Sequence, residues 1–216
     1  ACYMRPADEV GGDYYDILKI GDTVFLGIGD VTGHGLSAGV IMLMAQTALM
    51  TLSQTGETDI TQIMNVLNMV LYKNILRIRE DKNMTLAVLQ YRDGVFTLVG
   101  QHESVLICRA DGSIEEVSTM DLGLPVGLEE DIRSFIGTAR ITLGKGDTMV
   151  LYTDGVTEAE NAWQEQYTVE GLKRSLARNH HLGAHQLLEH INAELYEHIA
   201  GSKIYDYISL VYIKKN

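Results

Sequence analysis

The sequence predicts an α+β fold in which antiparallel sheets are covered by helices. Three observations lead to this prediction. Short apolar runs separated by tight-turn dipeptides occur in neighbouring groups, stretches of helical periodicity lie between these groups, and the regular strand–helix alternation of a parallel sheet is missing. The simplest architecture that accounts for all three is two antiparallel β-sheets packed as a sandwich and flanked by helices.

The individual elements follow from local period and turn chemistry. Apolar runs bounded by Gly-Asp or Asp-Gly are typical of hairpin strands, whereas apolar residues at every third or fourth position are typical of helices. In chain order we expect strands at 14–20 and 23–29, helices at 38–52 (with Ser37 as N-cap) and 60–78, strands between 84 and 117 with turns at Asp93-Gly94 and Asp111-Gly112, a loop at 123–131, a central strand at 148–153, a helix at 184–199 and a closing strand at 208–213.

Composition restricts the class of protein. The 216 residues are 46% apolar and carry 17 Lys and Arg against 29 Asp and Glu, a net charge of −12. This length suits one domain with a sizeable core. The acidic balance argues against nucleic-acid binding, which needs clustered basic residues. No uninterrupted apolar stretch reaches about 18 residues, so we expect no membrane contact by this domain.

The cysteines and the first residue indicate the compartment and the extent of the chain. Cys2 and Cys108 lack the Cys-x-x-Cys spacing of a zinc site and form no disulfide framework, so we expect a reducing, cytoplasmic compartment. The chain begins with Ala1 rather than Met. We therefore interpret residues 1–216 as a single domain, either excised from a longer protein with an N-terminal regulatory domain or left by processing of the chain.

Four aspartates differ from the other acidic residues because each lies beside a tight turn at an end of a predicted strand. They are Asp13, Asp30, Asp154 and Asp206. Carboxylates at strand ends can converge at one edge of a sheet, and oxygen ligands of this kind suit Mg²⁺ or Mn²⁺. Two such ions about 3.5–4 Å apart can activate water and hold a phosphoryl group. Taken singly, however, each aspartate can be explained as an ordinary turn residue, because Asp is common in turns.

The order and surroundings of these aspartates point to a known family. They lie in four blocks, Arg5-Pro-Ala-Asp-Glu-Val-Gly-Gly-Asp13, Gly29-Asp30-Val-Thr-Gly-His34-Gly-Leu-Ser-Ala38, Tyr152-Thr-Asp154-Gly-Val-Thr-Glu158 and Asp206-Tyr-Ile-Ser-Leu210. These blocks closely resemble the metal-dependent protein phosphatases (the PPM, or type-2C, superfamily), and within it the bacterial sporulation-stage-II-E-like branch, which regulates sigma factors by partner switching. The resemblance runs from Arg5 to Val211.

The resemblance implies a two-sheet sandwich with two Mn²⁺ or Mg²⁺ ions at one end. By similarity, Asp30 would bridge both ions, and the backbone carbonyl of Val31 would be a further ligand. Asp154 and Asp206 would hold the first ion, and Asp13 would contact the second. A metal-bridging hydroxide would attack the phosphorus of phosphoserine or phosphothreonine in line, without a phosphoenzyme.

The resemblance also implies further roles and partners. His34 is the candidate general acid to the leaving seryl oxygen, because an imidazole exchanges a proton near neutral pH; a structural role in the strand-to-helix turn is the alternative. Gly155 would let the backbone pass close to the metals. The expected substrate is a phosphorylated anti-anti-sigma (STAS-type) protein. An upstream sensory or receiver domain would regulate the phosphatase, and residues 37–52 and 59–78 would meet a partner or a second copy in a homodimer.

Three departures from the family pattern are visible. Tyr207 stands where many relatives carry a second Asp or an Asn. Residues 100–104 read Gly-Gln-His-Glu-Ser where relatives often carry Ala-Gly-His-x-Pro, and we interpret His102 as structural or as part of the rim. No arginine matches the phosphate-binding arginine of the eukaryotic members, and we expect Arg5 to serve surface or packing roles.

Two alternative functions remain open at this point. A non-catalytic, pseudophosphatase domain would bind its partner without hydrolysis, although the retained aspartates argue against it. A two-metal phosphodiesterase or cyclase would turn over nucleotides, but Tyr14-Tyr15 follow Gly11-Gly12-Asp13 where the cyclase signature needs Glu-Phe. The histidines between 180 and 198 lack zinc-protease spacing, and we expect them to be solvated.

Overall fold

Both sheets of this protein are antiparallel in the computed structural model, which describes residues 1–5, 11–202 and 206–216. Residues 6–10 of the first motif block and Tyr205 therefore lie outside the described residues. Two units can be distinguished, and each is described by itself. Among the described residues, unit 1 contains 1–5, 103–117, 143–202 and 206–216, and unit 2 contains 11–102 and 118–142.

The sheet of unit 2 grows from the predicted hairpin. Gly21 has a positive φ in the turn and places Ile20 opposite Thr23. Every neighbouring pair in the sheet is antiparallel. The strand order is β2 (Tyr14–Ile20), β3 (Thr23–Val31), β4 (Met84–Arg92), β5 (Val95–Val99) and β8 (Thr138–Ile141).

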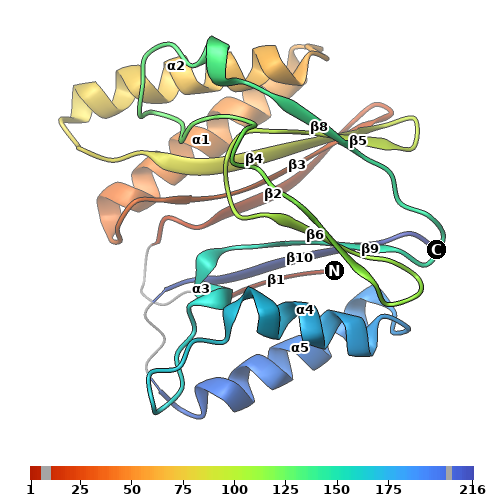
Figure 1. The fold of residues 1–216 in the computed structure, drawn as a ribbon. Coiled ribbons are helices and arrows are strands. Elements are labelled where there is room, and N and C mark those ends of the chain that lie inside the picture. Colours follow the sequence, from red (N-terminus) through yellow and green to blue (C-terminus); the bar gives the residue numbers. More distant parts are fainter. Residues whose placement is uncertain (6–10, 203–205) are drawn as a thin grey trace. The chain divides into compact units, whose positions relative to one another are not determined.

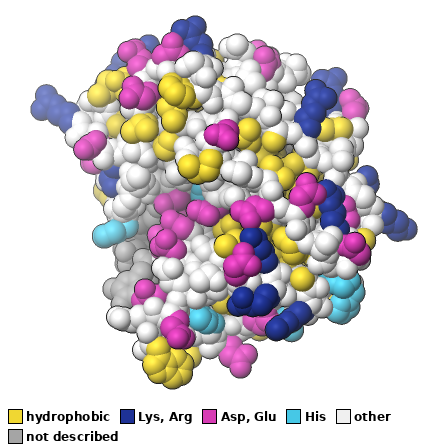
Figure 2. Space-filling model, in the orientation of Figure 1, with side chains coloured by type: hydrophobic (Ala, Val, Ile, Leu, Met, Phe, Trp, Pro, Cys, Tyr) yellow, Lys and Arg dark blue, Asp and Glu magenta, His cyan; other side chains and the backbone are white. Residues whose placement is uncertain are grey.

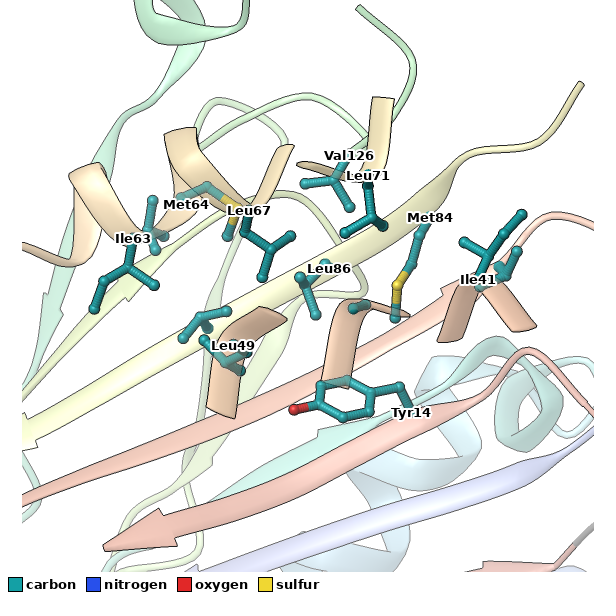
Figure 3. Close-up of a cluster of buried hydrophobic side chains, with 14 of the residues drawn as sticks. Tyr14, Ile41, Leu49, Ile63, Met64, Leu67, Leu71, Met84, Leu86 and Val126 are labelled. Carbon is teal, nitrogen blue, oxygen red and sulfur yellow. The ribbon is translucent and has the colours of Figure 1, made fainter. Parts of the chain in front are cut away.

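Two helices cover one face of this sheet, α1 (Leu36–Gln54) and α2 (Ile60–Ile78) (Figure 1). The Asp59 carboxylate caps α2 by accepting the N–H of Thr61. Helix α1 is capped differently from the prediction, because Gly35 occupies the N-cap position and Ser37 lies inside the first turn. Figure 3 shows the apolar side chains that the helices and the sheet bury together, among them Tyr14, Ile41, Leu49, Ile63, Met64, Leu67, Leu71, Met84, Leu86 and Val126.

Helix α1 is long and apolar enough to cross a membrane by length and composition alone, with 19 residues and a mean hydropathy of 1.6. The core helix of a globular unit meets the same criterion. Ala38, Ile41, Ala45 and Leu49 form a fully buried stripe on α1, at the spacing of one helical face. We therefore interpret α1 as a core helix of unit 2.

The sheet of unit 1 places its most apolar strand at the centre, as predicted. Strand β9 is buried along its whole length and pairs with a strand on each side. The last strand of the chain lies inside the sheet, because the N-terminal strand pairs with its outer edge. The strand order is β1 (Cys2–Arg5), β10 (Ile208–Lys214), β9 (Thr148–Tyr152), β6 (Val105–Cys108) and β7 (Ile114–Val117).

Helices α4 (Thr168–Asn179) and α5 (Ala184–Ile199) pack on this second sheet, and the short α3 (Asp154–Thr157) follows β9 directly (Figure 1). Their buried residues, such as Leu172, Leu176 and Ile191, join those of the strands in one apolar cluster. The α+β class with two antiparallel sheets and flanking helices is thus confirmed. The sequence did not predict β1, β8, α3, α4 or the 3-10 turn Arg133–Phe135.

A buried polar side chain of α2 forms hydrogen bonds with the loop that follows strand β7. Asn68 is fully buried, and its amide nitrogen donates to the carbonyls of Glu129 and Glu130, at 2.9 and 3.3 Å. Its amide oxygen accepts the N–H of Gly127 at 2.9 Å. In the same loop, Val126 exchanges two backbone hydrogen bonds with Met84, the first residue of β4. Asn68 therefore holds the loop where it can join the sheet.

Asn68→Ala should destabilise unit 2, because it leaves the buried N–H of Gly127 without its acceptor and removes the donor to the partly buried carbonyls of Glu129 and Glu130. We expect a loss of about 1–3 kcal/mol in the free energy of unfolding, measured by urea denaturation. Asn74→Ala in the same helix is the control. Asn74 is only half buried, so its replacement should change stability by no more than about 0.5 kcal/mol. Equal effects of the two variants would contradict this role of Asn68.

Candidate metal centre

The end of β3 gathers three of the predicted ligands in unit 2. Asp30 and Val31 are the last residues of β3 and pair with Thr85 and Met84 of β4, which fixes their backbone. The β2–β3 register pairs Tyr14 with Gly29. One step beyond this pair, Asp13 comes opposite Asp30. Asp13 is buried, with 3% of its surface exposed.

Gly12 is required for this close approach. A Cβ atom at Gly12 would lie 2.8 Å from Oδ1 of Asp30 and 2.8 Å from the carbonyl oxygen of Val31, closer than real side chains come. The absence of a side chain therefore lets the Gly11-Gly12-Asp13 backbone pass beside both oxygens. The carboxylate of Asp30 and the carbonyl of Val31 face the same point, as two ligands of one cation would.

His34 lies in the loop that joins β3 to α1. It is exposed, between Gly33 and Gly35, whose φ angles of 74° and 89° are in the left-handed region. These glycines let the chain reverse from the strand into the helix within a few residues. The loop thus places an exposed imidazole three residues beyond Val31.

A second pair of predicted ligands comes together in unit 1. Asp154 follows β9 and begins α3, and Asp206 lies two residues before β10. A carboxylate oxygen of Asp154 lies within 4.8 Å of one of Asp206. Gly155 makes this possible, because a Cβ there would meet the carbonyl oxygen of Tyr207 at 2.0 Å. The strand end and the chain before β10 can approach only where residue 155 has no side chain.

The Asp154 carboxyl group is in an environment that favours a bound cation. Its Oδ1 is buried and has no hydrogen-bond partner among the described residues. Burial raises the pKa of Asp154, and the nearby carboxylates of Asp206 and Glu158 raise it further. A divalent ion would remove both penalties, since it supplies positive charge and coordinates the unpaired oxygen. The donor set in this half is made of hard oxygens and fits Mg²⁺ or Mn²⁺.

Asp154→Asn should therefore raise the melting temperature of the metal-free protein, because a charge that is costly in the folded state disappears. We expect an increase of roughly 2–4 °C by differential scanning fluorimetry. The wild-type protein should gain stability when Mn²⁺ is added, and the variant should lose most of this gain. A metal-free variant less stable than the wild type, or an unchanged response to Mn²⁺, would contradict the assignment.

Glu103 is an acidic neighbour that the sequence did not single out. Desolvation raises the pKa of its carboxyl group, with further contributions from Asp154, Glu158 and Glu116. The sequence gives only a weak signal for Glu103, because it follows His102 in a stretch that departs from the family pattern. Glu103 adds negative charge beside Asp154 and strengthens the demand for a cation there.

A chain of hydrogen bonds links the backbone of Asp30 to Thr85 and His102. The hydroxyl of Thr85 donates to the backbone carbonyl of Asp30 at 3.4 Å and lies 2.9 Å from Nδ1 of His102. His102 is half buried, and its backbone N–H donates to the hydroxyl of Thr119 at 3.0 Å. These contacts are compatible with the predicted role of His102 as a structural residue or part of the rim.

Other predicted roles can be located in unit 1. The Arg5 guanidinium lies over the Tyr196 ring, 4.9 Å from its centroid, in agreement with the packing role predicted for it. Tyr207 is buried, and its carbonyl oxygen accepts the hydroxyl hydrogen bond of Thr153 at 3.3 Å. The cysteines are free, Cys2 exposed and Cys108 buried. Each unit thus collects its own ligands, Asp13, Asp30 and Val31 in unit 2 and Asp154 and Asp206 in unit 1, and their union in one site stays a prediction.

Comparisons with known proteins agree with the motif reading. Phosphoserine phosphatase RsbU of Bacillus subtilis is 27% identical over 175 residues, which are 77% of this chain and 49% of RsbU. The chain thus spans about half of that relative. The solved SiaA-PP2C domain of Pseudomonas aeruginosa has a TM-score of 0.84 at 20% identity and covers all of this chain, with 85% of that chain matched.

A further solved structure, RsbX in complex with magnesium, has a TM-score of 0.66 at 14% identity. The match covers 98% of this chain and 92% of the RsbX chain. At these identities the structures show the fold alone, which is that of PP2C domains. The family model described as "Stage II sporulation protein E (SpoIIE)" matches residues 20–216, most of the chain and all of its ligand-bearing segments but the first. This chain belongs to the stage II sporulation protein E (SpoIIE) family.

Proposed function

We propose that this chain is a metal-dependent protein serine/threonine phosphatase that hydrolyses phosphoserine or phosphothreonine. The observation that carries the proposal is the buried, unpaired oxygen of Asp154 beside Asp206, in a family whose relative RsbU is named a phosphoserine phosphatase. A structural aspartate would have satisfied that oxygen with a donor. A cation-binding aspartate keeps it available.

The proposed ligands are the five residues implied by the resemblance. Asp30 would be a ligand of both divalent ions, and the carbonyl of Val31 would be a further ligand. Asp154 and Asp206 would hold one ion, and Asp13 would contact the other. The magnesium bound to RsbX supports a divalent ion, either Mg²⁺ or Mn²⁺. Such ions, when bound, supply an activated water and positive charge opposite the phosphoryl group.

The chain's own residues would perform the remaining tasks. The glycines at 12 and 155 let the backbone approach the ligands without obstruction. His34 would donate a proton to the leaving seryl oxygen, a role that its exposed position in the β3–α1 loop permits. Thr85 and His102 would hold the Asp30 backbone in place from the opposite side.

The substrate and partners follow from the same family context. We expect a phosphorylated STAS-type protein as substrate and an upstream sensory or receiver domain as regulator. We also expect a homodimer. A groove of about 550 Å³ between α1 and α2 is lined mainly by apolar side chains, including Leu43 and Leu52, and a second copy would cover it. Sedimentation velocity tests this, and a monomer at high concentration would contradict it.

The enzyme assignment is tested by phosphate release. The purified chain should hydrolyse para-nitrophenyl phosphate and a phosphoserine protein in the presence of Mn²⁺, and EDTA should abolish both activities. Absence of hydrolysis with Mn²⁺ on both substrates would contradict the proposal and favour a non-catalytic domain. Turnover of nucleotides instead would favour a two-metal phosphodiesterase or cyclase.

A further inference from the structure

The backbone just beyond Val31 is held by the segment that leads into β4. The N–H of Thr32 donates to the carbonyl of Asn83 at 2.9 Å, and the hydroxyl of Thr32 accepts the N–H of Asn83 at 3.1 Å. In a regular antiparallel ladder, the carbonyl of Thr32 would accept that N–H. The hydroxyl takes its place, so the carbonyl of Thr32 is available to another donor.

Lys82 is this donor. Its ammonium group donates to the carbonyl oxygen of Thr32 at 2.7 Å, and within the described part of the chain this is its only hydrogen bond. Gly33 leaves room for the ammonium group, because a Cβ atom at that position would lie 2.9 Å from Nζ of Lys82. Lys82 and Asn83 together therefore bind both backbone polar groups of Thr32.

These contacts determine how the peptide group before Thr32 is oriented. The described residues contain no cis peptide bond, and a trans peptide group points its N–H and its C=O in opposite directions. Since the N–H of Thr32 faces Asn83, the carbonyl of Val31 points to the opposite side. The position of that oxygen agrees, because a Cβ atom at Gly12, in the segment before β2, would lie 2.8 Å from it.

The peptide group after Thr32 is oriented in the same way. Its carbonyl is bound by Lys82, so its N–H, which belongs to Gly33, points away from Lys82 and to the same side as the carbonyl of Val31. The N–H of Gly33 makes no hydrogen bond within the described part of the chain. One side of the loop thus presents a carbonyl oxygen, which suits a cation, next to an N–H group, which suits an anion.

Lys82 is distinguished by this contact and not by basic surroundings. The two residues before it are Glu80 and Asp81, and no ion pair joins Lys82 to either of them. Figure 2, in the orientation of Figure 1, shows basic and acidic side chains interspersed over the helices of unit 2. The charge of Lys82 therefore acts locally, because a hydrogen bond from an ammonium group is stronger than one between neutral groups.

We propose that Lys82 is a positioning residue of the phosphatase reaction, which directs the N–H of Gly33 toward an oxygen of the phosphoryl group. The inference rests on the proposed function, in which the carbonyl of Val31 is a metal ligand and the phosphoryl group lies next to the ions. The N–H of Gly33 donates to a phosphoryl oxygen and stabilises the negative charge that develops there. Lys82 acts through the Thr32–Gly33 peptide group and does not touch the substrate.

Lys82→Met should lower kcat by about 10- to 100-fold, both with para-nitrophenyl phosphate and with a phosphoserine protein, because a misdirected donor stabilises the transition state less. KM should change little, since the donor acts mainly in the transition state. Lys82→Arg should keep most of the activity, because a guanidinium group also donates to a carbonyl. Lys19→Met removes the same charge from an exposed position near the far end of β2, and this control should leave kcat within about twofold of the wild type.

Nuclear magnetic resonance of the backbone amides gives a readout that does not depend on catalysis. With Mg²⁺ present, inorganic phosphate should shift the amide proton of Gly33 downfield in the wild-type and Lys82→Arg proteins, because a hydrogen bond to an anion forms. In Lys82→Met this shift should be largely lost. A Gly33 resonance that stays unchanged in the wild type, at a phosphate concentration that inhibits hydrolysis, would contradict the proposal.

The outcomes separate this proposal from the assignment of function. A wild-type protein inactive with Mn²⁺ on both substrates would contradict the phosphatase function itself. With an active wild type, equal kcat values for Lys82→Met and Lys19→Met would contradict only the role of Lys82. The same conclusion would follow if urea denaturation showed that loss of folded protein accounts for the whole effect of Lys82→Met, since Lys82 would then serve stability alone. An Arg variant as impaired as the Met variant would also overturn the role of the cationic donor.

Discussion

Asp30→Asn is expected to abolish the metal-dependent hydrolysis of phosphoserine, with a fall in kcat of at least about 10³-fold. Several kcal/mol of transition-state stabilisation depend on the bound ions, and each 1.36 kcal/mol corresponds to about a factor of ten. Asparagine keeps the size of the side chain but removes the negative charge that would hold both ions. The measurement is kcat at saturating Mn²⁺ with para-nitrophenyl phosphate and with a phosphoserine protein.

Asp22→Asn is the matched control for this variant. Asp22 lies in the exposed turn at the other end of the same hairpin, so its replacement removes the same charge from the same pair of strands. It should leave kcat within about twofold of the wild type, as expected for a surface change of about 0.5 kcal/mol or less. A comparable loss in both variants would show that net charge, rather than ligation, is responsible.

Gly155→Ala is expected to damage both activity and stability. The added Cβ would lie 2.0 Å from the Tyr207 carbonyl and 3.3 Å from the carbonyl carbon of Asp206. Since these are backbone atoms, they cannot rotate away, and the segments that carry Asp154 and Asp206 must separate. We expect a loss of about 3 kcal/mol in the free energy of unfolding and a fall in kcat larger than this loss of folded protein explains.

The control for Gly155→Ala is Gly171→Ala in α4. A Cβ at Gly171 would contact the ring of Tyr167 at an ordinary 3.5 Å, and alanine is the better helix former by up to about 1 kcal/mol. This variant should therefore unfold at the same or a higher urea concentration. If Gly155→Ala also proved as stable and as active as the wild type, the close approach of α3 and the segment before β10 would be contradicted.

Where local sequence signals agreed with tertiary packing, the fold could be predicted. The turn at Gly21-Asp22 defined the β2–β3 hairpin, and the spacing of Ile63, Leu67 and Leu71 defined the buried face of α2. Strand β9 was predicted to be central because its residues are apolar on both faces, and it has a neighbour on each side. In each of these elements a single hydrophobic pattern extends over the whole length of the element.

The missed elements lack such signals. Strands β1 and β8 have four residues each, too few for alternation to be distinguished from chance, and their pairing partners are remote in the sequence. Helix α4 is polar except for one narrow stripe that includes Leu172 and Leu176. That stripe does have helical spacing, so the period could have revealed α4 in a longer window.

The candidate ligands could be predicted from the sequence, but the residues that surround them and hold their segments in place could not. The aspartates were found because turn and strand signals surround each of them, and Asp154 and Asp206 do lie together in unit 1. Glu103 and Asn68 could not be found this way. The burial that raises the pKa of Glu103 and the three backbone contacts of Asn68 depend on segments far away in the sequence.

The central claim is that the oxygen ligands Asp13, Asp30, Val31, Asp154 and Asp206 of this chain bind divalent ions, and counting bound Mn²⁺ tests it most directly. Equilibrium dialysis of the purified chain, with free Mn²⁺ quantified by electron paramagnetic resonance, should give about two ions per wild-type chain. Asp30→Asn and Asp154→Asn should each bind fewer ions, and Asp22→Asn should bind as many as the wild type. Phosphate release by a chain that binds no Mn²⁺, or full Mn²⁺ binding by Asp30→Asn and Asp154→Asn, would contradict the account.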